Sequence, residues 1–218
     1  MQKVIILGGI GNGSVIAQAI ADANRRNYNN LEMIGYLNDR EEKDSQIEGY
    51  PVLGKLTDAG KYAKEGYKFI NTIYRIDGQK ERLDIFAKLG IGDDNLAIFI
   101  HPTAYIAPNV IIEPGVVIMP YVMISAGAKI GKASLIMVGA SIGHNTEVGS
   151  YNHIAAQAVI GAYIKMGTGV HIGLNATLRE NLVLGDYSTV GMGAVLTKNT
   201  GTGEIWAGNP AKFLRMAD

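Results

Sequence analysis

The sequence contains no cysteine. This absence excludes disulfide bonds, thiolate metal sites and a cysteine nucleophile, and with them any acyl-enzyme formed on a thiol. The apolar run Met1–Leu7 is too short for a signal peptide, and no run reaches the roughly 20 residues of a membrane-spanning helix. We therefore expect a cytoplasmic protein that does not insert into a membrane.

Charge is scarce in one part of the chain. The 20 Lys and Arg residues balance the 20 Asp and Glu residues, and there is no basic run, so nucleic acid is not expected as a partner. Residues 1–99 hold 27 charged residues, whereas the longer segment 100–218 holds only 13. The change predicts two domains, at residues 1–97 and 98–218.

A six-residue period governs the second segment. Aliphatic residues or Met recur at Ile100, Ile106, Ile112, Ile118, Ile124, Ile130, Ile136, Ile142, Val148, Ile154, Ile160, Met166, Ile172, Leu178, Leu184, Val190 and Leu196. This period is typical of a parallel β-helix, in which three short strands and three corners close one coil. The aliphatic side chains would stack into one core, and glycine and asparagine would supply corners with positive φ. A β-sandwich would show variable turn spacing instead, and the period alone does not determine the hand of the coil.

The first segment reads as a small Rossmann-like βαβ domain of three or four parallel strands. A strand at Val4–Leu7 leads into the glycine-rich turn Gly8–Gly13 and then a helix, and a second strand ends in Asn38 and Asp39. Free N–H groups at the start of a helix bind phosphate, and an acidic residue at the tip of the second strand contacts a ribose or base. The pattern predicts a nucleotide-type ligand. The alternative is that the glycines only form a tight turn.

Together the two segments resemble one family, the sugar O- and N-acyltransferases of the sialic acid O-acetyltransferase and bacillosamine N-acetyltransferase type. The resemblance covers nearly the whole chain. Its marks are the glycine-rich turn, the uninterrupted repeats, His101-Pro102 and the segments Gly35–Asp39, Gly49–Gly54, Gly191–Lys198 and Ala207–Lys212. It implies a left-handed parallel β-helix, a homotrimer with sites between subunits, acetyl-CoA as co-substrate and no metal. It also implies that the first domain holds a nucleotide-linked sugar.

The resemblance further implies roles for individual residues. Acyl transfer requires a base for the proton of the acceptor, and the catalytic histidine of the family falls on His144, followed by Asn145. The residues that would line the acetyl-CoA groove are His153, Gly161, Ala162, Gly173, Leu174, Gly191 and Met192, and those that would hold the acceptor are Gly11, Asn12, Gly13, Asn38 and Asp39. His171 comes 18 residues after His153, so we expect the two to stack one coil apart.

The sequence departs from the family pattern at several of these positions. Asn145 replaces an acid and carries no charge to stabilise an imidazolium, and Glu147 is the nearest substitute. Asn12 replaces a histidine, and Asn38 replaces the first of two acids. The segment Ile73-Tyr74-Arg75 replaces a turn that contains glycine. These departures indicate an unusual acceptor or an altered activity.

The sequence therefore predicts an acetyltransferase that moves the acetyl group of acetyl-CoA directly to the amino group of a UDP-linked amino sugar, with His144 as general base. One alternative is an O-acetyltransferase of sialic acid or another glycan sugar. Another is a non-catalytic nucleotide-sugar-binding or assembly protein. A metal-dependent lyase of the γ-carbonic anhydrase type needs three convergent histidines, and His144, His153 and His171 do not follow that spacing.

Two expectations concern surfaces. Apolar residues on the flat sides of the β-helix, such as Val117, Met119, Val159 and Val183, are expected to be exposed and to contact other subunits. Trp206, which follows the last repeat, is expected to cover the open end of the β-helix or to flank the CoA tail.

Overall fold

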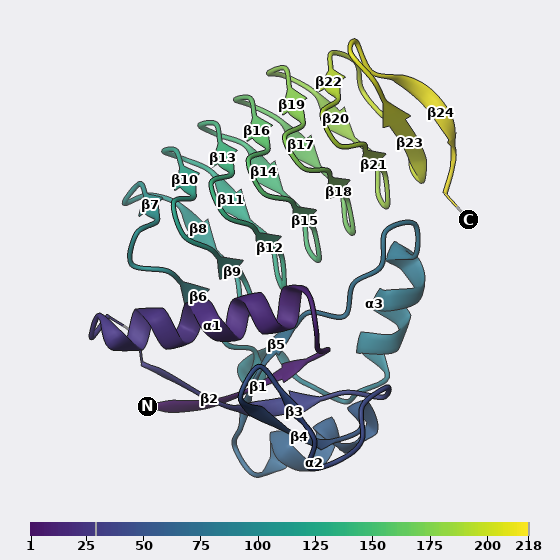
Figure 1. Ribbon diagram of the computed structural model, residues 1–218. Helices are drawn as coiled ribbons and strands as arrows, with labels where there is room; N and C mark the ends of the chain where they lie inside the picture. The colour runs from purple at the N-terminus through teal and green to yellow at the C-terminus, as the bar shows by residue number, and fades with distance from the viewer. Residues whose placement is uncertain (29, 218) are drawn as a thin grey trace.

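The first part of the chain is an α/β layer built on one five-stranded sheet (Figure 1). The computed structural model describes residues 1–28 and 30–217. The strand order is β3-β4-β2-β1-β5, and all neighbours are parallel except β3 and β4. The elements are β1 (Gln2–Leu7), α1 (Asn12–Arg25), β2 (Leu31–Leu37), β3 (Gln46–Ile47), β4 (Tyr50–Gly54), α2 (Ala59–Lys64), β5 (Lys68–Asn71) and α3 (Gln79–Ala87), with 3₁₀ turns at Leu56–Asp58 and Asp93–Asn95.

The order of these elements agrees with the sequence-based prediction, and so does the number of parallel strands. Three or four parallel strands were expected, and the four strands β4, β2, β1 and β5 are parallel. The fifth strand, the antiparallel β3, was not expected, because its two residues are too few to show a periodic pattern. Val4–Leu7 in β1 is fully buried, as expected of a central parallel strand covered on both faces. None of the helices within the described residues is long and apolar enough to cross a bilayer.

The second part is a left-handed parallel β-helix of two-residue strands, arranged as three sheets that we call faces 1, 2 and 3. Face 1 contains β6 (Phe99–Ile100), β9 (Val117–Ile118), β12 (Leu135–Ile136), β15 (His153–Ile154), β18 (His171–Ile172) and β21 (Thr189–Val190). Face 2 contains β7 (Tyr105–Ile106), β10 (Met123–Ile124), β13 (Ser141–Ile142), β16 (Val159–Ile160), β19 (Thr177–Leu178) and β22 (Val195–Leu196). Face 3 contains β8 (Ile111–Ile112), β11 (Lys129–Ile130), β14 (Glu147–Val148), β17 (Lys165–Met166) and β20 (Val183–Leu184).

The six-residue period produces the core of the β-helix. From Ile118 to Leu196 every residue of the series is at most 6 % exposed and points inward. At the start of the series Ile106 and Ile112 also pack against this core but are only half-buried, and the expectation is wrong for Ile100, which is 38 % exposed. These three residues belong to the first coil, which has no earlier coil to cover it.

Glycine serves two different purposes in the coils. One residue in each corner has a positive φ, at six-residue spacing from Gly115 to Gly193. Tyrosine occupies four of these positions, so the expectation that glycine and asparagine form the corners is only partly right. The glycines that directly follow the inward aliphatic residues satisfy another constraint. A Cβ on Gly131 would lie 2.5 Å from the carbonyl carbon of Gly149 in the next coil. These glycines therefore permit close stacking of backbone on backbone.

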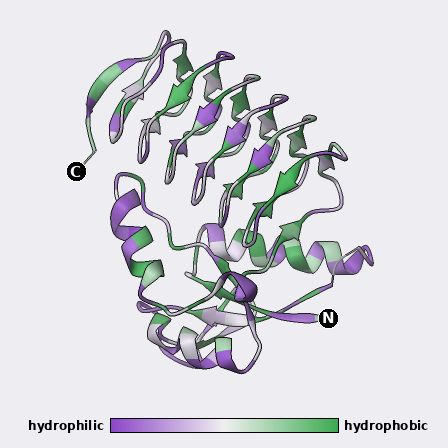
Figure 2. Cartoon of the chain, turned by 180° about the vertical axis from the view of Figure 1, so that it is seen from behind, coloured by the Kyte–Doolittle hydropathy of each residue, from purple (hydrophilic) through white to green (hydrophobic). Residues whose placement is uncertain are grey.

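The α/β layer packs on face 1 (Figure 1). Helix α1 and strand β1 share one apolar cluster with Phe99, Val117, Met119, Leu135 and Met137. Val117 and Met119 are thus buried, and the expectation that they are exposed is wrong, because the first part of the same chain covers them. The α/β layer leaves faces 2 and 3 uncovered. In the view from behind, the middle strands of one uncovered face carry hydrophilic residues (Figure 2), which agrees with Lys129, Glu147 and Lys165 on face 3.

The chain ends in a hairpin that continues face 1. Strand β23 (Glu204–Ala207) pairs in parallel with β21, and β24 (Lys212–Met216) pairs antiparallel to β23. Trp206 packs against the apolar core of the β-helix, and its indole N–H donates to Glu204 Oε2 at 2.8 Å. The position agrees with the expectation that Trp206 covers the end of the coil.

The close stacking of coils predicts unequal costs for two Gly→Ala substitutions. Gly131→Ala should lower the free energy of unfolding by about 3 kcal/mol or more, because the new methyl group meets backbone that has no room to move. Gly193→Ala should cost only about 1–2 kcal/mol, since its φ is positive but the space around it is open. Urea unfolding of both variants measures the difference. Equal costs would contradict the stacking explanation.

Candidate active site at the domain junction

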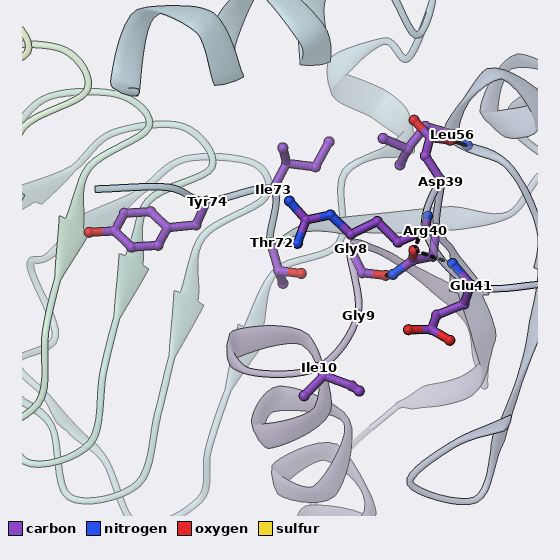
Figure 3. A pocket seen from close by; sticks show the side chains of 11 residues that line it. Gly8, Gly9, Ile10, Asp39, Arg40, Glu41, Leu56, Thr72, Ile73 and Tyr74 are labelled. Atoms are coloured by element: carbon purple, nitrogen blue, oxygen red, sulfur yellow. Dashed lines mark hydrogen bonds between the residues drawn. The ribbon is translucent and has the colours of Figure 1, made fainter. Parts of the chain in front are cut away.

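A pocket of about 410 Å³ lies at the carboxyl ends of the central strands of the α/β sheet (Figure 3). Three loops form it: Gly8–Ile10 after β1, Asn38–Glu41 with Leu56 after β2 and β4, and Thr72–Tyr74 after β5. Chain connections leave β1 toward β2 on one side, while β5 pairs with β1 on the other. Ligands of parallel α/β sheets bind at such a reversal of strand order.

Close contacts with neighbouring side chains require glycine at two positions of the glycine-rich turn. A Cβ on Gly9 would lie 2.2 Å from Nδ2 of Asn38, and one on Gly13 would lie 3.1 Å from Oγ1 of Thr72. Gly11 has a φ of 99° and open space around it. In this turn the pocket is lined by Gly8, Gly9 and Ile10. The three residues predicted to hold the acceptor sugar are not among them: Gly11 and Asn12 lie outside the lining, and Gly13 is buried.

At the tip of β2, Asn38 stabilises the loop and Asp39 has a carboxylate oxygen that can bind a ligand. Asn38 donates to the carbonyl of Gly8 at 3.1 Å and accepts from the N–H groups of Arg40 and Glu41 at 2.7 and 3.1 Å, so its side chain is used within the loop. Asp39 Oδ1 accepts from the N–H of Leu56 at 2.9 Å, and Oδ2 makes no hydrogen bond among the described residues. Both residues line the pocket.

Arg40, which the sequence-based prediction missed, is the exposed cation of this pocket. Figure 3 shows its side chain reaching across the pocket toward Thr72 and Ile73. Within residues 1–28 and 30–217 it forms no ion pair, so its charge is available to an anionic ligand. An arginine directly after a strand tip is common in surface loops, which is why the sequence alone did not single it out.

Beyond the pocket, Tyr74 connects the α/β layer with two stacked histidines on face 1. His153 and His171 are partners in register on neighbouring strands, with ring centroids 5.2 Å apart, as their spacing predicted. Tyr74 stacks on His153 at 4.2 Å between centroids, and its hydroxyl lies 2.6 Å from Nδ1 of His171. Asn12 Nδ2 lies 3.1 Å from Nε2 of His153. Side chains from two loops of the α/β layer thus close over the histidine pair.

Burial lowers the pKa values of the basic side chains in this cluster. Both histidines are 5 % exposed. Burial lowers the pKa of His153 to about 3, helped by His171 and the nearby Arg82, and burial with Arg82 lowers the pKa of His171 to about 4. Arg82 is itself buried, which lowers its pKa to about 10, and its guanidinium lies 5.0 Å over the ring of Tyr74. The cluster therefore holds both imidazoles neutral at physiological pH.

His144, the predicted base, lies elsewhere. It is exposed in the corner between faces 2 and 3, on the edge opposite face 1, and it contacts Tyr163 edge-on at 4.9 Å between centroids. Asn145 has a φ of 57°, and its side chain lies over Gly127 of the preceding coil, so its residue type suits the corner. Glu147 lies 3.6 Å from Lys129 on face 3, and among the described residues it forms no hydrogen bond or ion pair with the imidazole of His144.

The residues predicted to line the CoA groove lie on two edges of the prism. Gly161 and Ala162 lie in the corner between faces 2 and 3, one coil after His144. Gly173 with Leu174 and Gly191 with Met192 lie in stacked corners between faces 1 and 2. Both edges border face 2, but a single chain does not bring them together. Among the described residues no group of three His, Asp or Glu side chains could hold a metal ion.

Comparison with known proteins assigns the two parts of the chain. Residues 3–95 match the PglD N-terminal domain, and residues 127–162 match the bacterial transferase hexapeptide model of six repeats. No curated protein matches the chain in sequence.

Solved structures resemble nearly the whole chain. The acetyltransferase domain of PglB from Neisseria gonorrhoeae, in complex with acetyl coenzyme A, is 27% identical with a TM-score of 0.83, over 98% of this chain and 99% of that one. A mutant perosamine N-acetyltransferase from Caulobacter crescentus, in complex with CoA and GDP-perosamine, is 22% identical with a TM-score of 0.85, over 99% and 98%. WeeI from Acinetobacter baumannii is 22% identical with a TM-score of 0.80, over 98% and 100%.

The buried histidine pair predicts acid sensitivity of the fold. The unfolded chain takes up protons near the ordinary histidine pKa of 6.5, whereas the folded pair does so only near 3 and 4. The free energy of unfolding should therefore fall as the pH drops from about 6.5 toward 4, with each histidine contributing up to about 1.4 kcal/mol per pH unit. Urea unfolding across this range measures the slope. His171→Leu should reduce the slope by about one proton, and an unchanged slope would contradict this origin.

Proposed function

We propose that this chain, an acyltransferase whose two parts match the PglD N-terminal domain and the hexapeptide transferase model, transfers the acetyl group of acetyl-CoA to the amino group of a nucleotide-linked sugar. The observation that carries the proposal is the joint presence of a β-helix of this superfamily and a pocket at the strand tips of the α/β layer. The solved relatives that carry CoA or acetyl coenzyme A, and GDP-perosamine in one case, support both substrates.

The pocket suits a nucleoside diphosphate. Its volume of about 410 Å³ falls within the roughly 300–1,000 Å³ of small-molecule sites. The start of α1 offers backbone N–H groups to an anion, and Arg40 adds a free positive charge. The carboxylate of Asp39 keeps one oxygen for a ribose hydroxyl or a base N–H. These groups fit a nucleoside diphosphate sugar, and the family resemblance favours a UDP-linked amino sugar as the acceptor.

The chemistry is a direct transfer with His144 as general base. The amine nitrogen of the acceptor attacks the thioester carbonyl, the C–S bond breaks, and CoA leaves as its thiol. The imidazole of His144, which suits a base near neutral pH, takes the proton lost by the amine and then passes it to the departing CoA sulfur. Because the chain has no cysteine, no acyl group passes through a protein thiol. His153 would contact the acetyl-CoA end of the site.

A complete site requires a second copy of the chain. His144 lies on the edge opposite the α/β layer, so the pocket of one chain and the His144 of the same chain face different directions. Tyr105, Met123 and Val159 on face 2 are exposed and apolar, which favours contact with another copy. A homotrimer with acetyl-CoA between subunits would bring the edge with Gly161 and Ala162 toward the edge with Gly173, Leu174, Gly191 and Met192 of a neighbour.

A second candidate function is nucleotide-sugar binding without catalysis. The observation that favours it is the surroundings of His144, where Asn145 replaces an acid and Glu147 lies beside Lys129 instead. An imidazole without a carboxylate partner is a weaker base. O-acetylation of a sugar hydroxyl would use the same geometry, and the acceptor distinguishes it from N-acetylation.

The proposal is tested by measuring free thiol released from acetyl-CoA in the presence of a panel of UDP-, GDP- and dTDP-linked amino sugars. We expect release with at least one amino sugar and none with its N-acetylated or hydroxyl counterpart. Saturable binding of a nucleotide sugar without thiol release would favour the non-catalytic function. Release with the hydroxyl sugar would favour O-acetylation.

With the accepted sugar identified, His144→Ala should lower kcat by roughly 10²–10⁴-fold and leave CoA affinity unchanged, because the ring serves only proton transfer. Asn145→Asp should raise the pKa of the imidazole and raise kcat if the missing acid limits the rate. Isothermal titration with CoA supplies the binding control. Near wild-type turnover of His144→Ala would contradict its role.

A further inference from the structure

The imidazole of His144 has an aromatic neighbour in the next coil of the β-helix. Its ring centroid lies 4.9 Å from that of Tyr163, and the two ring planes meet at 87°. Aromatic pairs prefer this edge-to-face geometry at separations of roughly 4.5–7 Å. The backbone N–H of Tyr163 also donates to the carbonyl oxygen of His144 at 3.1 Å. The two exposed residues are therefore joined through both main chain and side chain.

Asn145 and Tyr163 lie on opposite sides of the imidazole along the axis of the β-helix. Both have positive φ in the corner between faces 2 and 3, one coil apart. The side chain of Asn145 reaches the preceding coil, where its Oδ1 lies 2.2 Å from the place of a Cβ on Gly127. The imidazole of His144 instead contacts the following coil. The amide that replaces an acid is thus used elsewhere, and Tyr163 is the side chain that meets the imidazole.

Core packing does not account for a tyrosine at this position. The side chain is 51 % exposed. At the same edge the other coils place Gly127, Asn145 and Asn181 at positive φ, and these residue types tolerate the left-handed region. Tyr163 adopts a φ of 56° against the preference of a bulky L-residue. A half-buried side chain that its own backbone disfavours points to a task at the surface.

The contact directs the imidazole toward the predicted acetyl-CoA groove. Gly161 and Ala162 directly precede Tyr163, in the coil that follows His144. An imidazole that contacts Tyr163 lies on the side of these residues, whereas one turned toward the preceding coil would lie away from them. The base is therefore held on the side where the thioester is expected.

We propose that Tyr163 is a positioning residue that holds the imidazole of His144 on the side of the acetyl-CoA groove. This inference rests on the proposed function. An exposed histidine samples several rotamers, and only a ring near the attacking amine can take its proton. A partner that favours one rotamer raises the fraction of molecules in which the base is ready to react. The aromatic ring of Tyr163 performs this task by its shape and quadrupole, so its hydroxyl group is not needed.

Kinetics with the accepted sugar separate this role from a structural one. Tyr163→Leu should lower kcat roughly two- to tenfold, as expected for the loss of one aromatic pair, with an unchanged KM for the sugar and an unchanged Kd for CoA. Tyr163→Phe keeps the ring and should retain the wild-type kcat. Tyr121→Leu, which removes an exposed tyrosine from another corner with positive φ, is the matched control and should change nothing. In a His144→Ala background Tyr163→Leu should cause no further loss, because the ring acts only through the imidazole.

The contact itself is measured by nuclear Overhauser effects between the two rings in the intact protein. We expect these effects in wild type and in Tyr163→Phe, and their absence from wild type would overturn the proposal whether or not the protein transfers acetyl groups. If the effects are present but no sugar is acetylated, the proposed function fails and the positioning role fails with it.

Three further results would also overturn the proposal. A low kcat of Tyr163→Phe would show that the hydroxyl group is required. A raised Kd for CoA with an unchanged kcat in Tyr163→Leu would show that the side chain serves the other substrate. A change in the oligomeric state of Tyr163→Leu, measured by light scattering, would show that the side chain serves assembly.

Discussion

The contact between the α/β layer and face 1 of the β-helix determines where every functional side chain of this protein can act. The first coils offer apolar residues such as Val117 and Leu135, which share a core with α1. The later coils offer His153, His171 and Thr189, which meet Asn12, Tyr74 and Gln79 through hydrogen bonds. Face 1 therefore contacts the α/β layer through apolar packing in its first coils and through hydrogen bonds in its later coils. Burial of these six polar side chains is tolerated because each has a hydrogen-bond partner.

This contact separates the parts of the site in a single chain. It buries the histidine pair under Tyr74, while His144 remains exposed on the opposite edge. The predicted CoA residues are likewise divided between two edges of face 2. Under the proposed function, a chain with this geometry would gain a complete set of groups only beside another copy, and the exposed apolar residues of face 2 would form the contact between the copies.

The sequence predicted those features that depend on local backbone geometry. The six-residue period predicted the coils and the stacking of His153 on His171, and the glycine-rich turn predicted a strand–turn–helix unit. It did not predict the contact of Tyr74 with His171, which joins residues 97 positions apart and exists only because the two domains dock. The same docking buried Val117 and Met119 against expectation. The departure from the family pattern at Tyr74 thus contacts His171 of the β-helix.

The shared site is tested most directly by complementation between two inactive variants. One carries His144→Ala and the other carries Asp39→Ala with Arg40→Ala, and the two are unfolded, mixed in equal amounts and refolded together. If the pocket of one chain works with His144 of another, roughly a quarter of the sites in randomly mixed oligomers contain both intact parts, and thiol release should recover to that level. Activity no higher than the sum of the separate variants would show that each chain forms its site alone and would contradict the shared arrangement.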